Sequence, residues 1–168
     1  QGIRAQGDGL YTTEKNKKLA VQTADCLPIL ATNDSCDFIA AIHGGWKGLA
    51  CGILETLLQK AALYQIKPKQ LRIIIGPAIS FESFEVNIDV LNSFQKQRNF
   101  LPKNCYKKHH TKWLLDLPAY SALTLIQKGV RAENISIMNV CTVLQNQYWF
   151  SYRCGDKTGR NWSWIERI

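Results

Sequence analysis

The sequence predicts an α+β fold in which helices pack in layers on mixed β-sheets, and three observations support this. The chain has 168 residues, which is the usual length of one domain and enough for a substantial buried core. Its 46% hydrophobic and 20% charged residues are typical of a globular protein. Its apolar runs and amphipathic stretches lack the regular strand and helix alternation of a doubly wound parallel sheet. We therefore expect a single layered α/β domain over residues 1–168.

The first half of the chain predicts three strands and a long helix. Two short extended runs within residues 19–31 are interrupted at residues 25–26. The apolar run 38–42 predicts a buried strand that ends in the turn 43–45. Over residues 46–62, apolar side chains recur at the i, i+3, i+4, i+7 spacing of an amphipathic helix. A strand, a glycine turn and a helix therefore follow one another directly.

The second half predicts one more strand, two helices and a final sheet. Residues 71–75 form an apolar run typical of a buried strand, and residues 84–94 fit a helix. Another helix is expected over 117–127, with Asp116 as its candidate N-cap. Three stretches rich in β-forming residues predict the final sheet, namely 135–138, 148–153 and 162–165.

The charge balance favours small anionic ligands. Lys and Arg number 21 against 13 Asp and Glu, for a formal net charge of +8. The basic residues are spread over several segments, without a basic helix or the aromatic signature of an RNA-binding sheet. No apolar run approaches the roughly 20 residues that span a bilayer. We therefore expect a phosphate-bearing small molecule as ligand, with neither nucleic acid nor membrane as partner.

The cysteines and the first residues predict a reducing compartment. The six cysteines form no CxxC pair and no dense disulfide framework, so reduced thiols are expected. The first residue is Gln1, and the opening segment has no apolar h-region of a secretory signal. We expect a cytoplasmic protein whose natural start lies upstream of this residue.

Cys26 and His43 are the first candidates for chemistry, because each interrupts or ends a buried run beside conformationally special residues. If the two side chains meet, two chemistries follow. Cys26 could be a nucleophile activated by His43, or the thiolate and the imidazole could be two ligands of zinc. The alternative is a buried apolar cysteine and a hydrogen-bonded core histidine. Sequence spacing leaves these interpretations open.

A candidate anion site follows His43. Gly44 and Gly45 lead into a helix, whose first backbone N–H groups lie at the positive end of its dipole, and Lys47 could add a point charge. Arg153 and Arg160 could bind an anion or form structural ion pairs. The adjacent pair 109–110, both histidines, lies in a hydrophilic stretch that we expect to be an exposed loop.

The segments TADCLPIL and AAIHGGWKGL, at residues 23–30 and 40–49, resemble the YfiH family. That family is variously described as laccase-domain polyphenol oxidase, peptidoglycan editing factor and purine nucleoside phosphorylase. The resemblance continues through IIIGPAIS, KWLLDLPAY, FSYR and the terminal TGR, and it spans nearly the whole chain. It implies a fold similar to that of the catalytic domain of cytotoxic necrotizing factor.

The resemblance also implies an activity: a zinc enzyme that phosphorolyses adenosine, inosine, guanosine and methylthioadenosine and deaminates adenosine. The family's cysteine ligand falls on Cys26 and one of its two histidine ligands on His43. The other histidine belongs to a motif that would precede this chain, so we expect an N-terminally shortened domain with an incomplete metal site. His109 or His110 could replace the missing ligand.

The resemblance and the local sequence pattern together give the candidate site residues. Cys26 and His43 are the metal ligands and, with Lys47 and Asp25, the catalytic candidates. Lys47 stands where the family usually has arginine, which keeps the charge but loses the planar fork suited to phosphate. The phosphate and substrate candidates complete the set: Gly44, Gly45, Lys47 and Arg153.

Other functions remain open at this stage. A Cys/His hydrolase or deamidase, including one that edits a peptidoglycan precursor, needs only the same pair of side chains. Copper-dependent phenol oxidation would need more histidines than the three in this chain. A basic binding module without catalysis is the remaining class. We expect a monomer or a small homo-oligomer.

Overall fold

The computed structural model describes residues 7–96 and 101–168, and a five-stranded mixed sheet lies at its centre. Three of its neighbouring strand pairs are antiparallel and the last pair is parallel. The strands, in spatial order, are β1 (Gly9–Thr12), β4 (Ile39–Gly44), β3 (Leu27–Asn33), β5 (Leu71–Ile75) and β9 (Ile135–Ile137). The mixed α/β prediction is therefore confirmed.

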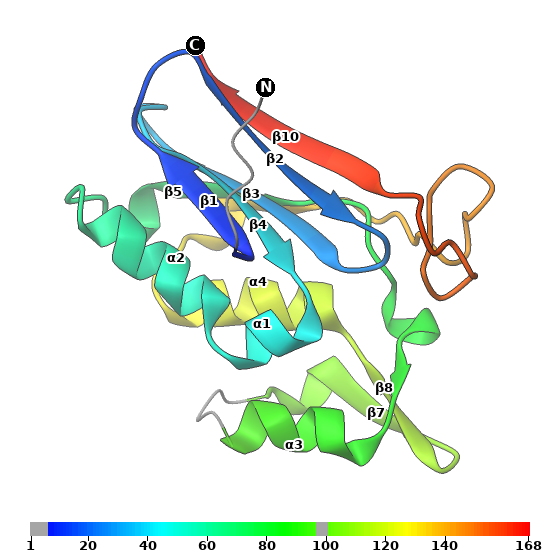
Figure 1. Ribbon diagram of the computed structural model, residues 1–168. Coiled ribbons are helices and arrows are strands. Elements are labelled where there is room, and N and C mark those ends of the chain that lie inside the picture. The colour runs from blue at the N-terminus through cyan, green and yellow to red at the C-terminus, as the bar shows by residue number, and fades with distance from the viewer. Residues whose placement is uncertain (1–6, 97–100) are drawn as a thin grey trace.

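Two smaller antiparallel sheets accompany the central one. β2 (Lys17–Thr23) pairs with β10 (Asn161–Arg167), and this ribbon lies over one face of the central sheet. Helices cover the opposite face, which gives the layered arrangement seen in Figure 1. The third sheet lies beyond the helices and has the order β6 (Glu85–Val86), β8 (Lys112–Leu115) and β7 (Tyr106–His109).

The helical layer contains a break that the periodicity did not predict. The expected helix over 46–62 is two helices, α1 (Trp46–Ala50) and α2 (Ile53–Ala62), separated at residues 51–52. Gly52 has a left-handed φ of 87°, a conformation that glycine adopts without steric cost. The apolar spacing continues across the break, because both helices pack on the same sheet.

The other two helices are α3 (Ile88–Lys96) and α4 (Leu117–Gln127). The bounds predicted for α4 are confirmed, and Asp116 is its N-cap, with the side chain accepting a hydrogen bond from Ala119 N at 2.8 Å. The helix expected over 84–94 begins later than predicted, because the short strand β6 occupies its first turn.

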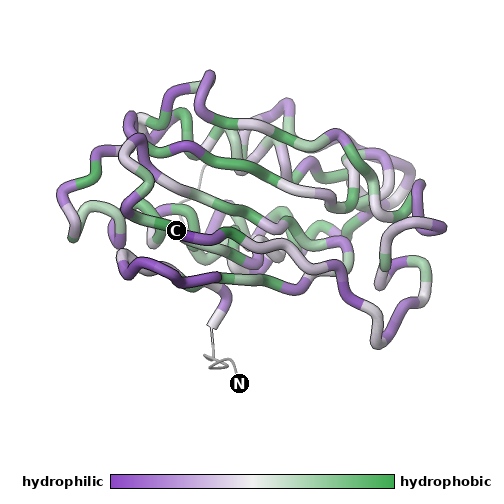
Figure 2. Tube along the Cα trace, turned by 90° about the horizontal axis from the view of Figure 1, so that it is seen from above, coloured by the Kyte–Doolittle hydropathy of each residue, from purple (hydrophilic) through white to green (hydrophobic). Residues whose placement is uncertain are grey.

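The hydrophobic core lies between the central sheet and the helices. Figure 2 shows hydrophobic residues along the central strands and hydrophilic ones in many of the connections. The ring of Phe94 on α3 meets that of Tyr120 on α4 edge to face, with centroids 4.8 Å apart. The largest fully buried side chains include Leu27, Ile29, Phe38, Leu49, Leu54, Ile73, Ile75 and Leu115.

Two predictions about the second half were wrong. Residues 148–153 form turns rather than a strand, since the Asn161 side chain takes the place of a strand neighbour. Its Oδ1 accepts from Phe150 N at 3.0 Å and its Nδ2 donates to Phe150 O at 2.8 Å. The stretch around His109 is the β7–β8 hairpin rather than a loop, and it turns at His110 with a positive φ of 53°, although both histidines are exposed as predicted.

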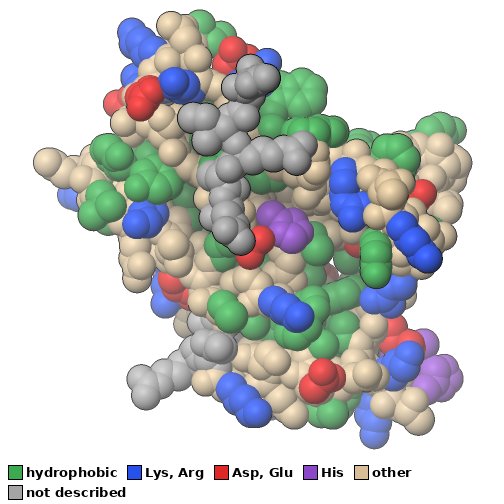
Figure 3. Space-filling model, in the orientation of Figure 1, with side chains coloured by type: hydrophobic (Ala, Val, Ile, Leu, Met, Phe, Trp, Pro, Cys, Tyr) green, Lys and Arg blue, Asp and Glu red, His purple; other side chains and the backbone are tan. Residues whose placement is uncertain are grey.

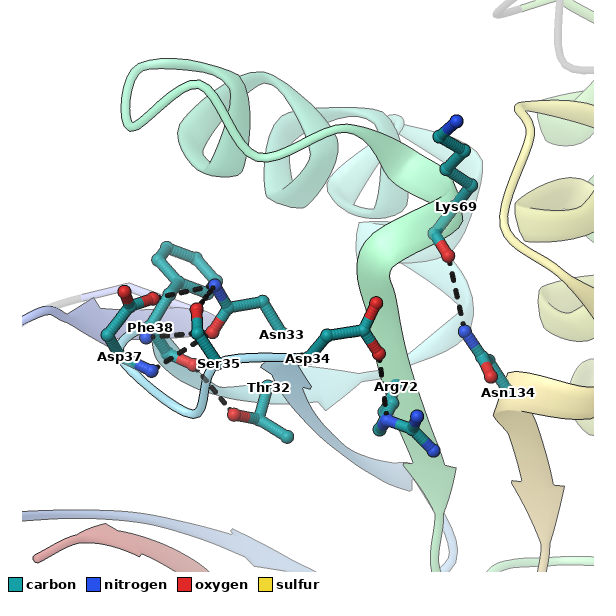
Figure 4. A network of polar contacts seen from close by, with 9 residues as sticks. All are labelled: Thr32, Asn33, Asp34, Ser35, Asp37, Phe38, Lys69, Arg72 and Asn134. Carbon is teal, nitrogen blue, oxygen red and sulfur yellow. Dashed lines mark hydrogen bonds and ion pairs between the residues drawn. The ribbon is translucent and has the colours of Figure 1, made fainter.

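The turn between β3 and β4 is organised by one side chain, as Figure 4 shows. Asn33 Oδ1 accepts from the backbone N–H groups of Asp37 and Phe38, each at 3.1 Å. Its Nδ2 donates to Ser35 Oγ at 2.9 Å and to Asp37 Oδ1 at 2.6 Å. This turn fixes the register of β3 against β4 at the end of β3 opposite to Cys26.

Within residues 7–96 and 101–168, no helix is long and apolar enough to cross a membrane.

Candidate active site

Strand register brings Cys26 and His43 together. In the β3–β4 pair, Leu27 is opposite Gly44 and Pro28 is opposite His43, so Cys26 lies just before β3 at the level where β4 ends. Both side chains flank Gly45: a Cβ built there would lie 3.4 Å from Cys26 Sγ and 3.4 Å from His43 Cε1. A larger residue at position 45 would therefore crowd both side chains.

His43 is held from both sides. Its Nδ1 lies 3.1 Å from Asp8 Oδ1, and its backbone N–H donates to Asp8 O at 2.7 Å. The hydrogen bond with Cys26 raises the pKa of His43 to about 9, partial burial opposes this, and Asp8 adds to it. The pair therefore favours an imidazolium beside sulfur when no metal is bound.

The donor chemistry of the pair fits zinc. Thiolate sulfur and imidazole nitrogen are the ligands zinc prefers, and the carboxylate of Asp8 on Nδ1 is the kind of outer partner that orients a metal-bound histidine. Nε2 is then the nitrogen on the side of Gly45. Among the residues that the structure describes, no group of three or more His, Cys, Asp and Glu could hold a metal ion. The described residues thus offer two side chains of the types that bind zinc.

A cavity of about 360 Å³ opens beside this pair. Such a volume lies within the range of small-molecule sites. Five of the residues proposed from sequence line it together: Asp25, Cys26, His43, Arg153 and Arg160. The remaining lining residues are Gln22, Thr23, Ala24, Ile79, Phe84 and Tyr152. Figure 3 shows Lys and Arg side chains gathered on the right-hand part of one face of the molecule.

Asp25, which lines the cavity, forms hydrogen bonds with three other segments of the chain. Its carboxylate accepts from Thr142 Oγ1 at 2.7 Å and from Arg153 N at 2.7 Å, while its carbonyl oxygen accepts from Ile79 N at 2.9 Å. Its φ of 86° lies in the left-handed region, which aspartate tolerates better than most residues. Asp25 is buried, so these hydrogen bonds are protected from water.

The cationic wall of the cavity consists of two arginines. Arg153 donates from both terminal nitrogens to Glu85 O, each at 3.3 Å, and its guanidinium lies 5.6 Å from the centre of the Phe84 ring. Arg160 Nη1 donates to the carbonyl oxygens of Lys157 and Gly159, at 3.2 and 2.6 Å. Carbonyl oxygens accept these bonds, and within the described part of the chain no carboxylate pairs with either guanidinium, so both positive charges are available to an anion.

The glycine turn leads from β4 into α1 as expected, with Gly45 as the N-cap of the helix. Gly44 is buried within β4, where an added Cβ would lie 3.0 Å from Leu27 Cβ and from Leu27 O, so close strand packing requires glycine. Lys47 does not line the cavity, and its Nζ lies 5.6 Å from the centre of the Trp46 ring. α1 has only five residues, which limits the dipole at its start.

His109 and His110 also lie outside the lining of the cavity. Nδ1 of His109 is 3.1 Å from Glu85 Oε1, and Lys112 Nζ is 2.9 Å from Glu85 Oε2. Hydrogen bonds from Lys112 and then from His109 lower the pKa of the half-buried Glu85 carboxyl. No contact brings either histidine to Cys26, so the structure lends no support to their replacing the missing ligand.

Some residues of the site were not predicted from the sequence. Asp8 is 35 positions from His43, and no local pattern connects them. Thr23 and Phe84 look like ordinary strand and core residues until the cavity is seen. Tyr152 stands beside Arg153 in a stretch that the sequence analysis assigned to a strand, where neighbours point to opposite faces.

Comparison with known proteins identifies the family. The family model for multi-copper polyphenol oxidoreductase laccase matches residues 2–167. The chain belongs to this laccase family. It is 34% identical over 156 residues to a "Purine nucleoside phosphorylase" of Bacteroides thetaiotaomicron, which covers 91% of this chain and 58% of that protein. It is 33% identical over 160 residues to "Purine nucleoside phosphorylase YfiH" of Escherichia coli, covering 95% and 63%. The resemblance to YfiH proteins is thus confirmed.

Two solved structures share the fold of this chain. The Bacillus licheniformis hypothetical protein YfiH superposes with a TM-score of 0.87 at 28% identity, over 96% of this chain and 61% of that one. YlmD from Geobacillus stearothermophilus gives 0.87 at 31% identity, over 95% and 60%. The chain thus spans about three fifths of these proteins.

Proposed function

We propose that this chain carries the catalytic residues of a purine nucleoside phosphorylase. One observation carries the proposal: the Cys26–His43 pair and the Arg153–Arg160 wall open on the same cavity of about 360 Å³. A metal-binding pair and an anion-binding wall around one small cavity fit a reaction between phosphate and a neutral nucleoside. The names of the relatives point to the same reaction class.

Phosphate binds against Arg153 and Arg160. Guanidinium groups match phosphate oxygens with two parallel hydrogen bonds, and both side chains line the cavity. The net charge of +8 adds a long-range attraction for the anion. The nucleoside lies against the aromatic rings of Phe84 and Tyr152, which offer flat apolar surface to a purine.

The reaction balances as a displacement at the sugar. An oxygen of phosphate forms a bond to C1′ as the bond between C1′ and N9 breaks, and the purine leaves with the electron pair and takes up a proton. Adenosine, inosine, guanosine and methylthioadenosine share this bond. Positive charge that develops on the sugar is stabilised by the bound phosphate, which the arginines hold beside it.

Cys26 and His43 would hold zinc, with Asp8 orienting the imidazole. When bound, zinc supplies Lewis-acid chemistry, which adenosine deamination also requires. Copper is the less favoured metal, because the three histidines of the chain are too few for a multicopper centre. The exposed thiols Cys36 and Cys154 fit a reducing compartment, and we propose the cytoplasm.

Asp25 acts in this scheme as a positioning residue rather than an acid or base. Both of its carboxylate oxygens already accept hydrogen bonds, from Thr142 and from the backbone of Arg153. The second bond fixes the segment that presents Arg153 to the cavity. Asp25 therefore acts on phosphate through Arg153.

One observation favours a second candidate function. The hydrogen bond that joins His43 to Cys26 is also the arrangement of a cysteine nucleophile with its base, as in a thiol hydrolase or deamidase, including one that edits a peptidoglycan precursor. The two functions make opposite demands on zinc. Zinc bound to Cys26 sulfur would activate the phosphorylase and block the nucleophile.

Product analysis tests the proposal. The purified protein, supplied with zinc, is incubated with inosine and phosphate, and hypoxanthine is measured by chromatography. We expect base release that depends on phosphate and is lost in Cys26→Ser and His43→Ala. Lys128→Gln, which changes a lysine paired with Glu55 outside the cavity, should retain activity. Base release that the Cys26 and His43 variants retain would overturn the proposal.

A further inference from the structure

Thr23 carries an unusual hydroxyl. It is the last residue of β2 and only 2% exposed, yet its Oγ1 has no hydrogen-bond partner within the part of the chain that the structure describes. A buried hydroxyl without a partner costs roughly 1 to 3 kcal/mol, and valine would have nearly the same shape without that cost. Such a group needs a physical reason.

The position of Thr23 offers that reason. Thr23 lines the same cavity as Cys26, His43 and the two arginines. It stands two residues before Asp25, whose hydrogen bonds fix Thr142 and the backbone of Arg153 beside the cavity. Rotation of about 120° about χ1 moves the hydroxyl of a threonine into the position of the methyl group or of the hydrogen on Cβ, so Oγ1 can turn towards a ligand. A ligand can therefore satisfy the hydroxyl without movement of the backbone.

We infer that Thr23 is a substrate-binding residue whose hydroxyl forms a hydrogen bond with a polar group of the bound nucleoside. This inference rests on the proposed phosphorylase function and adds a residue to it. The partner is either a ribose hydroxyl or a polar atom of the purine edge, both of which bond to a hydroxyl that donates and accepts. Phosphate is assigned to the arginines, so Thr23 affects the nucleoside rather than the anion.

Ser121 provides a matched control. Its Oγ is also buried without a partner within residues 7–96 and 101–168, but Ser121 lies on α4 and does not line the cavity. Removing either hydroxyl should leave the unfolding temperature unchanged or raise it. Only the removal at Thr23 should weaken nucleoside binding.

The test is steady-state kinetics with zinc, inosine and saturating phosphate, with the unfolding temperature measured in parallel. We expect Thr23→Val to raise KM for inosine roughly threefold to tenfold without loss of stability. Thr23→Ser, which keeps the hydroxyl, and Ser121→Ala should stay close to the original protein. KM for phosphate should be the same in all four proteins.

Deoxynucleosides distinguish the two partners. If a ribose hydroxyl is the partner, Thr23→Val should have no effect with the inosine that lacks that hydroxyl. If the base is the partner, the effect should persist with the 2′-, 3′- and 5′-deoxy compounds. A Thr23→Val protein with the original KM for inosine would overturn this inference alone. An original protein without phosphorolysis would overturn the proposed function, and this inference with it.

Discussion

Asp25 Oδ2 accepts a hydrogen bond from the backbone N–H of Arg153 at 2.7 Å, although 128 positions separate the two residues. We predict that Asp25→Asn lowers the free energy of unfolding by about 1 to 3 kcal/mol, because an amide cannot accept from both donors. Asp25→Ala should cost more, since it leaves two donors without a partner and puts alanine in the left-handed region. Denaturant unfolding measures both values.

The same hydrogen bond has a kinetic consequence. Asp25→Asn should raise KM for phosphate more than KM for inosine, because the lost hydrogen bond anchors Arg153 directly, whereas Phe84 lies on another segment of the chain. Thr142→Val, which removes the other hydrogen bond of the carboxylate, should lower stability while changing KM for phosphate less. If both variants changed the two KM values equally, Asp25 would have a general structural role only.

The two candidate phosphate sites can be separated. Arg160 lines the cavity, whereas Lys47 lies over Trp46 at the start of α1. We predict that Arg160→Gln raises KM for phosphate by roughly tenfold to a hundredfold, the usual effect of losing a charged hydrogen-bond donor. Lys47→Gln should have a smaller effect. If Lys47→Gln raised KM for phosphate more than Arg160→Gln did, the glycine turn would be the phosphate site instead.

The N-cap of α4 gives a prediction about pH. Burial, with the nearby Glu82 in addition, raises the pKa of Asp116 above its ordinary value of 3.8. The folded protein therefore holds this proton more tightly than the unfolded chain does, and ionisation of Asp116 lowers stability as pH rises above 3.8. Asp116→Asn keeps an N-cap acceptor and removes the charge.

Unfolding curves against pH test this expectation. Asp116→Asn should be at least as stable as the original protein at pH 7, and its advantage should disappear near pH 3. Asp116→Ala should be less stable by about 1 kcal/mol because the cap to Ala119 is lost. An original protein whose advantage over the asparagine variant grows with pH would contradict the effect of burial.

Alkylation of Cys26 can show whether this residue is a zinc ligand or a nucleophile. Cys26 is half-buried beside the cavity, whereas Cys105 is fully buried and burial raises its pKa to about 11. We predict that iodoacetamide at pH 8 modifies Cys26 in metal-free protein and leaves Cys105 unmodified until the protein unfolds. Zinc should slow the reaction at Cys26 but not at the exposed Cys154, as peptide mass spectrometry would show. Rapid modification of Cys26 in the presence of zinc would favour the thiol hydrolase.

Local sequence signals predicted the elements that depend on short-range patterns. The N-cap at Asp116 and the apolar spacing of α4 are local, and the structure confirms both. The break at Gly52 could not be predicted, because the residues on either side pack on the same sheet and keep one periodicity. Residues 148–153 form turns because the side chain of Asn161, eleven positions from Phe150, replaces a strand neighbour.

The sequence predicted several residues of the candidate site, but it could not predict how these residues lie relative to one another. Cys26 and His43 stand out because each ends or interrupts an apolar run, but their meeting depends on the β3–β4 register. Asp8 and Thr23 lack any local signal, since one is defined by a contact 35 positions away and the other by a missing partner. Arg153 was predicted as a cation, whereas its anchor on Asp25 needed the folded chain.

The central claim is that the cavity beside Cys26 and His43 joins phosphate to the sugar of a purine nucleoside. Phosphorus NMR of the zinc-supplied protein with inosine and inorganic phosphate tests it most directly. The account predicts a sugar 1-phosphate signal that grows in step with hypoxanthine and is absent in Cys26→Ser. Hypoxanthine released without sugar phosphate, or no base released at all, would contradict it.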